Sequence, residues 1–495
     1  MSLLSKVPHS IKFVLFLTIL FSAMMASVVV YARVDADPLK PTFSAQTSQV
    51  FLPAALYGRV THWSENSIFG VQTYNDTRQT SRFHKSMIDS GATWLRAAIY
   101  WSQAEPVNTS PANFKWVYAD QVLAAGLPGN GGLKVIATIE TAPSWAVIDP
   151  SRPDSPIKTE NLADFAEFVA AIVERFDGDG FQDAPGSPVI DYWELYNEPD
   201  RALNTRDGRW GNHGAEYANM LSVIYPVIKS QNPRAKVVFG GLAFDFFDSQ
   251  GGPFVRSFVD DVLAAGGGNY FDIFNFHSYP AFAQTWVPNG NPAGGPGLLQ
   301  KAQYLEKLLF DAGFSKPTFI TEAGWHSNNP PNSPGSEEIQ ARYVVQLFTQ
   351  SLAAGVDSMI WWMLFDPSDG SWDNGLITFD DPPRRKLAFT AYQTIVNRLT
   401  YEEFVRSLGV SETGNQAVEL YQFRDTSTGA TQYIVWLNPI ATTATTSIHL
   451  TAEEVSRYNL YGIHEGNLTD ESDGTDDGRI TISVNSQPAY IEVIR

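Results

Sequence analysis

Residues 189–199 have the sequence VIDYWELYNEP, in which an apolar segment typical of a buried β-strand ends in Asn197, Glu198 and a proline. Residues 319–325, FITEAGW, have the same arrangement around Glu322. In both segments a glutamate stands where a strand gives way to polar residues. We therefore expect two carboxylates to arrive from different strands and to meet in one cleft.

The sequence around these segments, from residue 53 to residue 398, alternates short apolar runs with helical patterns, which indicates a parallel sheet with crossover helices. Residues 162–176, for example, carry apolar side chains at helical spacing. This order predicts an α/β fold, a (β/α)8 or TIM barrel, whose active site lies at the C-terminal ends of the strands. Eight runs have the length and composition of strands: residues 68–73, 93–100, 134–140, 189–196, 236–242, 271–276, 317–321 and 357–364.

From residue 399 to residue 495 the pattern changes to alternating strands without long helices. This region is predicted to be a small antiparallel β-sandwich that follows the barrel. Sugar binding and stabilising contact with the barrel are both open as its role, and contact with the barrel is the simpler one. The expected strands are residues 418–424, 432–437, 445–450, 479–484 and 490–494.

The N-terminus carries a targeting signal. Two lysines precede an apolar run at residues 13–32, which ends in Val30-Tyr31-Ala32. Residues 1–32 are predicted to be a cleaved signal peptide or an uncleaved membrane anchor, because about 20 apolar residues also suffice to span a bilayer. Residues 33–52 are predicted to be a linker. Both alternatives place the rest of the chain outside the cytoplasm, secreted or at the cell surface, and only an uncleaved segment would hold it to a membrane.

Composition narrows the classes of function. The 495 residues are 44% hydrophobic, enough for a large core, and 34 basic against 53 acidic residues give a net charge of −19. This charge would repel nucleic acid and anionic membranes. The absence of cysteine excludes disulfides, a catalytic thiol and thiolate metal sites.

Two carboxylates in one cleft are what hydrolysis of a glycosidic bond needs: one protonates the leaving oxygen, and the other attacks or stabilises the anomeric carbon. The segments WELYNEP and ITEAGW resemble the fourth-strand and seventh-strand signatures of clan A retaining glycoside hydrolases, nearest to families five and thirty-nine. The resemblance covers about residues 53–398. It implies that Glu198 is the acid/base, that Glu322 is the nucleophile, that the substrate is a poly- or oligosaccharide, and that no cofactor is used.

Four further residues extend the resemblance. Arg96, in WLRAAIYW, is similar to the clan's second-strand arginine beside the nucleophile, where a fixed charge keeps the carboxylate ionised. Asn197 is similar to the asparagine that hydrogen-bonds the sugar 2-hydroxyl. His277 and Tyr279, in FHSY, match a sixth-strand His-x-Tyr pattern, which implies that Tyr279 lies near the nucleophile.

Aromatic side chains are expected where the face of a sugar ring must be held. Trp361 and Trp362 end the eighth predicted strand, where the clan commonly keeps a tryptophan under the sugar. Strand alternation allows only one of them to point inward, and the sequence does not distinguish them. Trp145, after the third strand, is a weaker candidate for binding substrate.

The segment Asp177-Gly178-Asp179-Gly180-Phe181-Gln182-Asp183 is a candidate calcium site. Three carboxylates on a Gly-rich turn supply the oxygen ligands that Ca²⁺ prefers. A solvated acidic turn is the equal alternative, and any ion there would be structural. No other metal is expected.

The predicted mechanism is double displacement by Glu198 and Glu322, on β-linked substrates as is commonest in the clan. We expect the negative charge of Glu322 to hold the proton of Glu198 to higher pH. Two alternatives stay open: an exo-acting enzyme similar to xylosidases or arabinosidases, and a non-catalytic surface protein that binds carbohydrate. A monomer is expected in each case.

Overall fold

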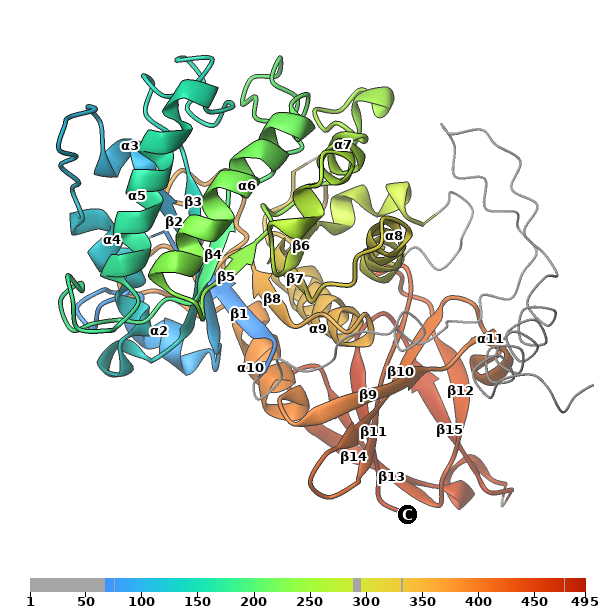
Figure 1. Ribbon diagram of the computed structural model, residues 1–495. Helices are drawn as coiled ribbons and strands as arrows, with labels where there is room; N and C mark the ends of the chain where they lie inside the picture. Colours follow the sequence, from blue (N-terminus) through green and yellow to red (C-terminus); the bar gives the residue numbers. More distant parts are fainter. Residues whose placement is uncertain (1–66, 75, 288–294, 331–332, 476) are drawn as a thin grey trace, which may run out of the picture. The chain divides into compact units, whose positions relative to one another are not determined.

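The computed structural model describes residues 67–74, 76–287, 295–330, 333–475 and 477–495 (Figure 1). The predicted leader (1–32) and linker (33–52) lie outside the described residues, as do residues 53–66 of the predicted barrel region. None of the helices in the described ranges is long and apolar enough to cross a membrane.

Eight parallel strands form one sheet in the order β5-β4-β3-β2-β1-β8-β7-β6. Parallel bridges Val238↔Ile273 and Leu242↔Phe276 join the two ends of this order and close the sheet into a barrel. The predicted (β/α)8 barrel is therefore confirmed. Its strands are β1 (Phe69–Gln72), β2 (Trp94–Tyr100), β3 (Lys134–Glu140), β4 (Tyr192–Leu195), β5 (Lys236–Val238), β6 (Phe274–Ser278), β7 (Thr318–Ala323) and β8 (Ser358–Trp361).

Helices alternate with these strands along the chain and lie outside them, as α4, α5 and α6 do around β2–β4 (Figure 1). The longer ones bury one apolar face: α5 buries its residues at positions 162, 165, 168, 169, 172 and 173, which recur at helical spacing. The helices of the barrel are α2 (His84–Asp89), α3 (Trp101–Ala104), α4 (Val117–Val122), α5 (Leu162–Arg175), α6 (Gly214–Gln231), α7 (Phe258–Ala264), α8 (Leu298–Asp311), α9 (Glu337–Ala353) and α10 (Leu387–Leu399).

The barrel interior is built in layers, because alternate residues of each strand point inward. The lower layer is an apolar cluster: Trp94, Ile136, Val238, Ile273, Phe319 and Ile360. Two residues further along four of the chain segments come polar side chains that all donate hydrogen bonds to Glu194: Arg96, Thr138, Asn275 and Thr321. The barrel therefore has a buried apolar layer below a layer of polar side chains.

A β-bulge interrupts β7 beside this polar layer. In the pairing with β6, Phe276 faces Ile320 but His277 faces Glu322, so Thr321 is the extra residue. Thr321 still points inward, since its hydroxyl bonds Asn275 and Glu194. The bulge thus allows the consecutive residues Thr321 and Glu322 both to face the interior, which strict strand alternation forbids.

The C-terminal region is antiparallel. A six-stranded sheet, β14-β13-β16-β11-β10-β9, and a two-stranded sheet, β12-β15, enclose an apolar cluster that includes Leu420, Ile448 and Ile482. The predicted β-sandwich is confirmed, with three strands that the sequence pattern missed (β9, β13 and β14), because exposed residues predominate in β14 and interrupt the apolar alternation of β9. The strands are β9 (Glu402–Ser407), β10 (Val418–Asp425), β11 (Thr431–Leu437), β12 (Thr446–Thr451), β13 (Glu454–Asn459), β14 (His464–Thr469), β15 (Arg479–Val484) and β16 (Ala489–Val493).

Candidate active site

Glu198 lies in the loop that follows β4. Its backbone N–H donates to the carbonyl of Gly241 at 2.8 Å, and Asn197 forms a parallel bridge with the same glycine, which follows β5. Tyr196 and Glu198 both have left-handed backbone, with φ of 68° and 43°. Such backbone is uncommon for residues with side chains, and it marks a turn that the surroundings hold in place.

Glu322, on β7, has a hydrogen-bond donor on each carboxylate oxygen. Arg96 Nη1 donates to Oε1 at 2.6 Å, and the Tyr279 hydroxyl donates to Oε2 at 2.6 Å. Only 7% of the residue is exposed. The two donors hold the carboxylate in one orientation.

Arg96 connects the interior of the barrel to this site. Its guanidinium makes two bonds to Glu194, at 2.7 and 2.9 Å, and others to Gln72 at 3.1 Å and to Asn197 Oδ1 at 2.7 Å. Glu194 is fully buried; burial acts to raise its pKa, but the charge and hydrogen bonds of Arg96 lower it. A second carboxylate, whose ionised form Arg96 favours, thus holds the arginine in place from the interior of the barrel.

His277 lies between the two predicted catalytic carboxylates. Its Nδ1 is 3.3 Å from Glu198 Oε1 and 3.7 Å from Glu322 Oε2, while its Nε2 is 3.3 Å from Thr321 Oγ1. One oxygen of each carboxylate and one ring nitrogen all lie within 4.8 Å of one another. The two carboxylates and the imidazole therefore lie close together at one end of the barrel.

The pKa of Glu198 departs from the expectation. Burial acts to raise it, but the hydrogen bond and positive charge of His277, together with the charges of Arg209 and Arg201, lower it to about 2. The prediction that Glu322 would hold the proton on Glu198 is therefore wrong for the free protein, because these cations outweigh the neighbouring carboxylate.

The cluster of Glu198, His277 and Glu322 has ligand types that suit a metal, but its surroundings oppose one. Both oxygens of Glu322 already accept hydrogen bonds. Arg96 and Arg209 place positive charge beside the two carboxylates, with Arg209 Nη1 3.8 Å from Glu198 Oε2. A cation here would replace these donors and face their repulsion.

The structure shows different surroundings for the three predicted tryptophans. Trp362 is partly buried, its indole N–H donates to the Tyr74 hydroxyl at 3.1 Å, and its ring meets that of Tyr279 edge-on at 6.4 Å. Trp361 is fully buried and donates to the carbonyl of Asn374, so it belongs to the core and not to the site. Successive residues of a strand point to opposite sides, and Ile360 belongs to the inward apolar layer, so Trp361 points outward. Trp145, in the loop after β3, packs edge-on against a buried tryptophan, Trp101, at 5.3 Å.

The structure also brings together the three carboxylates of the candidate calcium turn. One oxygen each of Asp177, Asp179 and Asp183 lie within 4.8 Å of one another. Backbone N–H groups of the same turn donate to all three side chains. Burial and the charges of the other two carboxylates raise the pKa of Asp177. These contacts are equally those of a solvated acidic turn.

Sequence reasoning missed three residues of the site. Glu194 stands four residues before Glu198 in the same motif. It lies an even number of residues from a strand position that faces inward, and this spacing predicts that Glu194 faces inward as well. Glu140, the last residue of β3, offered the same signal. Arg209 comes from a long loop, and nothing in its sequence context indicates that it lies beside Glu198.

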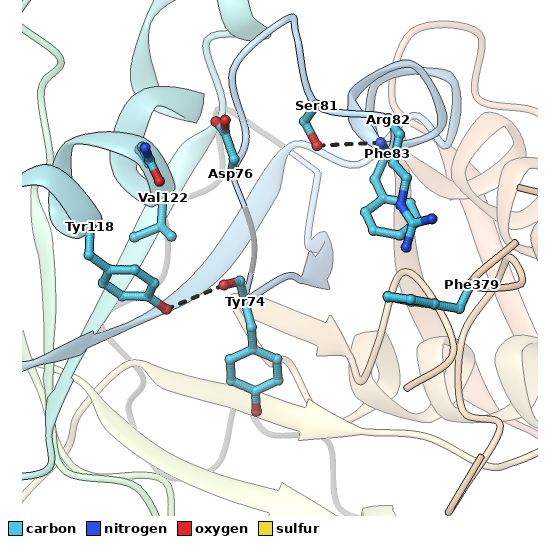
Figure 2. Close-up of a pocket in the computed structure, with 9 residues that line it drawn as sticks. Tyr74, Asp76, Ser81, Arg82, Phe83, Tyr118, Val122 and Phe379 are labelled. Carbon is cyan, nitrogen blue, oxygen red and sulfur yellow. Dashed lines mark hydrogen bonds between the residues drawn. The ribbon is translucent and has the colours of Figure 1, made fainter. Parts of the chain in front are cut away.

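A pocket of about 470 Å³ adjoins Tyr74, whose backbone faces the pocket while its ring points away from it (Figure 2). The Tyr118 hydroxyl donates to the Tyr74 carbonyl at 3.3 Å, and the Arg82 guanidinium lies 4.1 Å from the ring centre of Phe379. None of the predicted site residues lines this pocket. Its lining residues are Tyr74, Asp76, Ser81, Arg82, Phe83, Tyr118, Gln121, Val122 and Phe379.

Solved structures share this architecture. A family 39 glycoside hydrolase from the gut symbiont Bacteroides cellulosilyticus WH2 matches with a TM-score of 0.63 and 18% identity, over 86% of this chain and 80% of the other. The chain has the fold of a glycoside hydrolase. The catalytic domain of family 30 xylanase C from Talaromyces cellulolyticus matches with a TM-score of 0.55 and 13% identity, over 87% and 98% of the two chains.

A family 39 β-xylosidase from Caulobacter crescentus matches with a TM-score of 0.54 and 16% identity, over 86% and 96% of the two chains. No protein-family model matches this chain, and no curated protein sequence matches it.

Proposed function

We propose that this protein is a retaining glycoside hydrolase that cleaves β-linked O-glycosidic bonds of an extracellular poly- or oligosaccharide. The observation that carries the proposal is the pair Glu198 and Glu322, with carboxylate oxygens within 4.8 Å of each other at the C-terminal end of a closed parallel barrel. Retaining glycosidases have carboxyl groups at about 5–5.5 Å, whereas inverting ones have them at about 6.5–9.5 Å. The fold shared with glycoside hydrolases supports the same conclusion.

In the proposed reaction Glu322 attacks the anomeric carbon while Glu198 donates a proton to the leaving oxygen. Arg96 and Tyr279 hold the carboxylate of Glu322 in one orientation before the attack. Oε1 of Glu198, the proton donor, lies 3.3 Å from His277 Nδ1. Glu198 then deprotonates the water that releases the glycosyl-enzyme.

Asn197, which Arg96 holds through its Oδ1, is suited to donate from its amide N–H2 to the sugar 2-hydroxyl. Trp362 is suited to cover the apolar face of the sugar beside Tyr279. We expect no cofactor, because two carboxylates suffice for this chemistry.

Mass spectrometry after incubation with 2-fluoro glycosides tests the assignment directly. We expect a covalent label on Glu322 and, by proton NMR, a first-formed product with the anomeric configuration of the substrate. Glu198→Gln and Glu322→Gln should each lower turnover by a factor on the order of a thousand or more. An inverted first product, or a label on another carboxylate, would contradict the proposal; sugar binding without any turnover would favour the non-catalytic alternative.

The similar structures include both a xylanase and a β-xylosidase, so exo-action on xylosides or arabinosides is kept as the second candidate. Sizing of the products from polysaccharides separates the two, since long oligosaccharides come only from endo-action. We also propose that the protein is exported and monomeric. Export rests on the apolar run at residues 13–32, and N-terminal sequencing of the exported protein tests whether that run is removed.

A further inference from the structure

Glu140 is the last residue of β3, and it points into the mouth of the barrel. Ile136 belongs to the inward apolar layer and Thr138 to the polar layer above it, where its hydroxyl donates to Glu194 at 2.7 Å. Strand alternation therefore turns Glu140, two residues further on, to the same side. This is the end of the barrel at which Glu198 and Glu322 lie.

The carboxylate of Glu140 is unlike its neighbours in having no hydrogen-bond partner among the residues that the structure describes. Glu194 accepts hydrogen bonds from several groups, Glu322 accepts from two, and Asp154 accepts from the backbone and hydroxyl of Thr141. Glu140 is also partly exposed, whereas the five residues before it in β3 are buried. An acceptor left open at a cleft is available to a ligand.

The backbone around Glu140 is well fixed. Glu140 pairs with Tyr100 of β2, and the ring of Tyr100 stacks on that of Tyr118 at 5.4 Å. The next residue, Thr141, has left-handed backbone (φ 55°) and is held by Asp154 at 2.9 Å. A carboxylate on so rigid a support loses little conformational freedom when it binds.

The charges that face Glu140 come from several elements. Arg96 on β2 and the loop residue Arg209 attract it, and Glu194 on β4 and the loop residue Asp154 repel it. Burial, with the repulsion from Asp154, raises the pKa of Glu140 to about 7. Both of its protonation states accept hydrogen bonds from hydroxyl groups, so neither excludes a neutral sugar.

We propose that Glu140 binds the substrate sugar, with its two carboxylate oxygens accepting hydrogen bonds from hydroxyls on neighbouring carbons of a neutral pyranose at the cleavage point. The inference rests on the proposed function for the position of that sugar. It adds a specificity residue on β3 to the carboxylates on β7 and after β4.

Binding of aryl thioglycosides, whose sulfur link resists hydrolysis, tests this role without requiring turnover. Calorimetry would compare phenyl thio-β-glucoside, thio-β-xyloside and thio-β-mannoside on the wild type, and then the singly deoxygenated analogues of the tightest binder. Glu140→Ala should weaken binding of the parent sugar roughly tenfold or more, and Glu140→Gln should weaken it less. For the analogues that lack a hydroxyl contacted by Glu140, Glu140→Ala should bind almost as tightly as the wild type does. Glu167→Ala, an exposed glutamate on α5, is the matched control and should bind as the wild type does.

An equal loss on the parent sugar and on every deoxy analogue would overturn the assignment, because a general disturbance of the site would not distinguish hydroxyls. Failure of all three parent thioglycosides to bind the wild type would overturn it as well. If binding depends on Glu140 but the protein hydrolyses no O-glycoside, the hydrolase proposal fails and the role of Glu140 stands. If the protein hydrolyses O-glycosides but Glu140→Ala weakens the binding of all analogues equally, the hydrolase proposal stands and the role of Glu140 fails.

Discussion

At the scale of single residues, positive charge beside Glu198 controls its proton. Arg209 Nη1 lies 3.8 Å from Glu198 Oε2, and a cation at this distance favours the ionised carboxylate and lowers its pKa. Arg209→Gln should therefore raise that pKa. The limb of the pH profile on which activity falls because the acid loses its proton should move to higher pH, by about one unit. The pH dependence of kcat/KM measures this shift.

The matched control is Arg206→Gln in the same loop, because the Arg206 side chain is 95% exposed and lies 4.0 Å from the exposed carboxylate of Asp207. Its profile should superimpose on that of the wild type. A basic limb that stays in place in Arg209→Gln, or moves to lower pH, would show that Arg209 does not act on the acid.

At the scale of elements, the ends of β5, β6 and β7 meet at a glycine. A Cβ at Gly241 would lie 2.2 Å from His277 Nε2 and 2.8 Å from Thr321 Oγ1, and the Gly241 N–H donates to Glu194 at 3.0 Å. Gly241→Ala should displace His277 and lower kcat about a hundredfold, with a loss of about 1–3 kcal/mol in the free energy of unfolding from overpacking. Circular dichroism should show unchanged secondary structure.

Gly409→Ala is the control, since that glycine has φ −87° and an added Cβ would meet nothing within 4 Å. Its stability and turnover should match those of the wild type. Full activity in Gly241→Ala would mean that the close approach of β5 to His277 is not needed for the reaction.

At the scale of the whole molecule, the barrel and the β-sandwich share one core. Aromatic residues of the sandwich such as Tyr421 and Tyr490 belong to the same buried cluster as barrel helices α9 and α10. Arg398, near the end of α10, lies over the rings of Tyr458 and Tyr490 at 4.1 and 4.8 Å and pairs with Glu492 at 2.6 Å. These contacts fit the simpler role of the sandwich, contact with the barrel.

Arg398→Ala should lower the free energy of unfolding by about 1–3 kcal/mol, because it removes a partly buried cation–π contact and an ion pair together. Chemical denaturation measures the change. Arg406→Ala, on β9, removes an exposed pair with Glu412 and an exposed hydrogen bond to Gln422, and should cost less than about 1 kcal/mol. Equal losses in the two variants would indicate that the contact between the regions adds no stability.

The barrel, the sandwich and the two glutamates at strand ends could be predicted from the sequence. These features are written in local patterns: alternation along strands, helical spacing between them, and polar residues where an apolar run stops. The strand limits were less accurate, as with β4, which begins at residue 192 and not 189, because only part of each apolar run pairs with a neighbour.

The other features of the site depend on contacts between residues far apart in the chain. The bulge in β7 arises from pairing with β6, and it turns Glu322 inward beside Thr321. Whether Trp361 or Trp362 faces the site depends on which alternate residues of β8 point into the barrel. Arg209 reaches Glu198 from a loop that has no regular sequence pattern. The low pKa of Glu198 follows from such neighbours. Each of these features depends on groups far apart in the chain, whose distances no local pattern of residues contains.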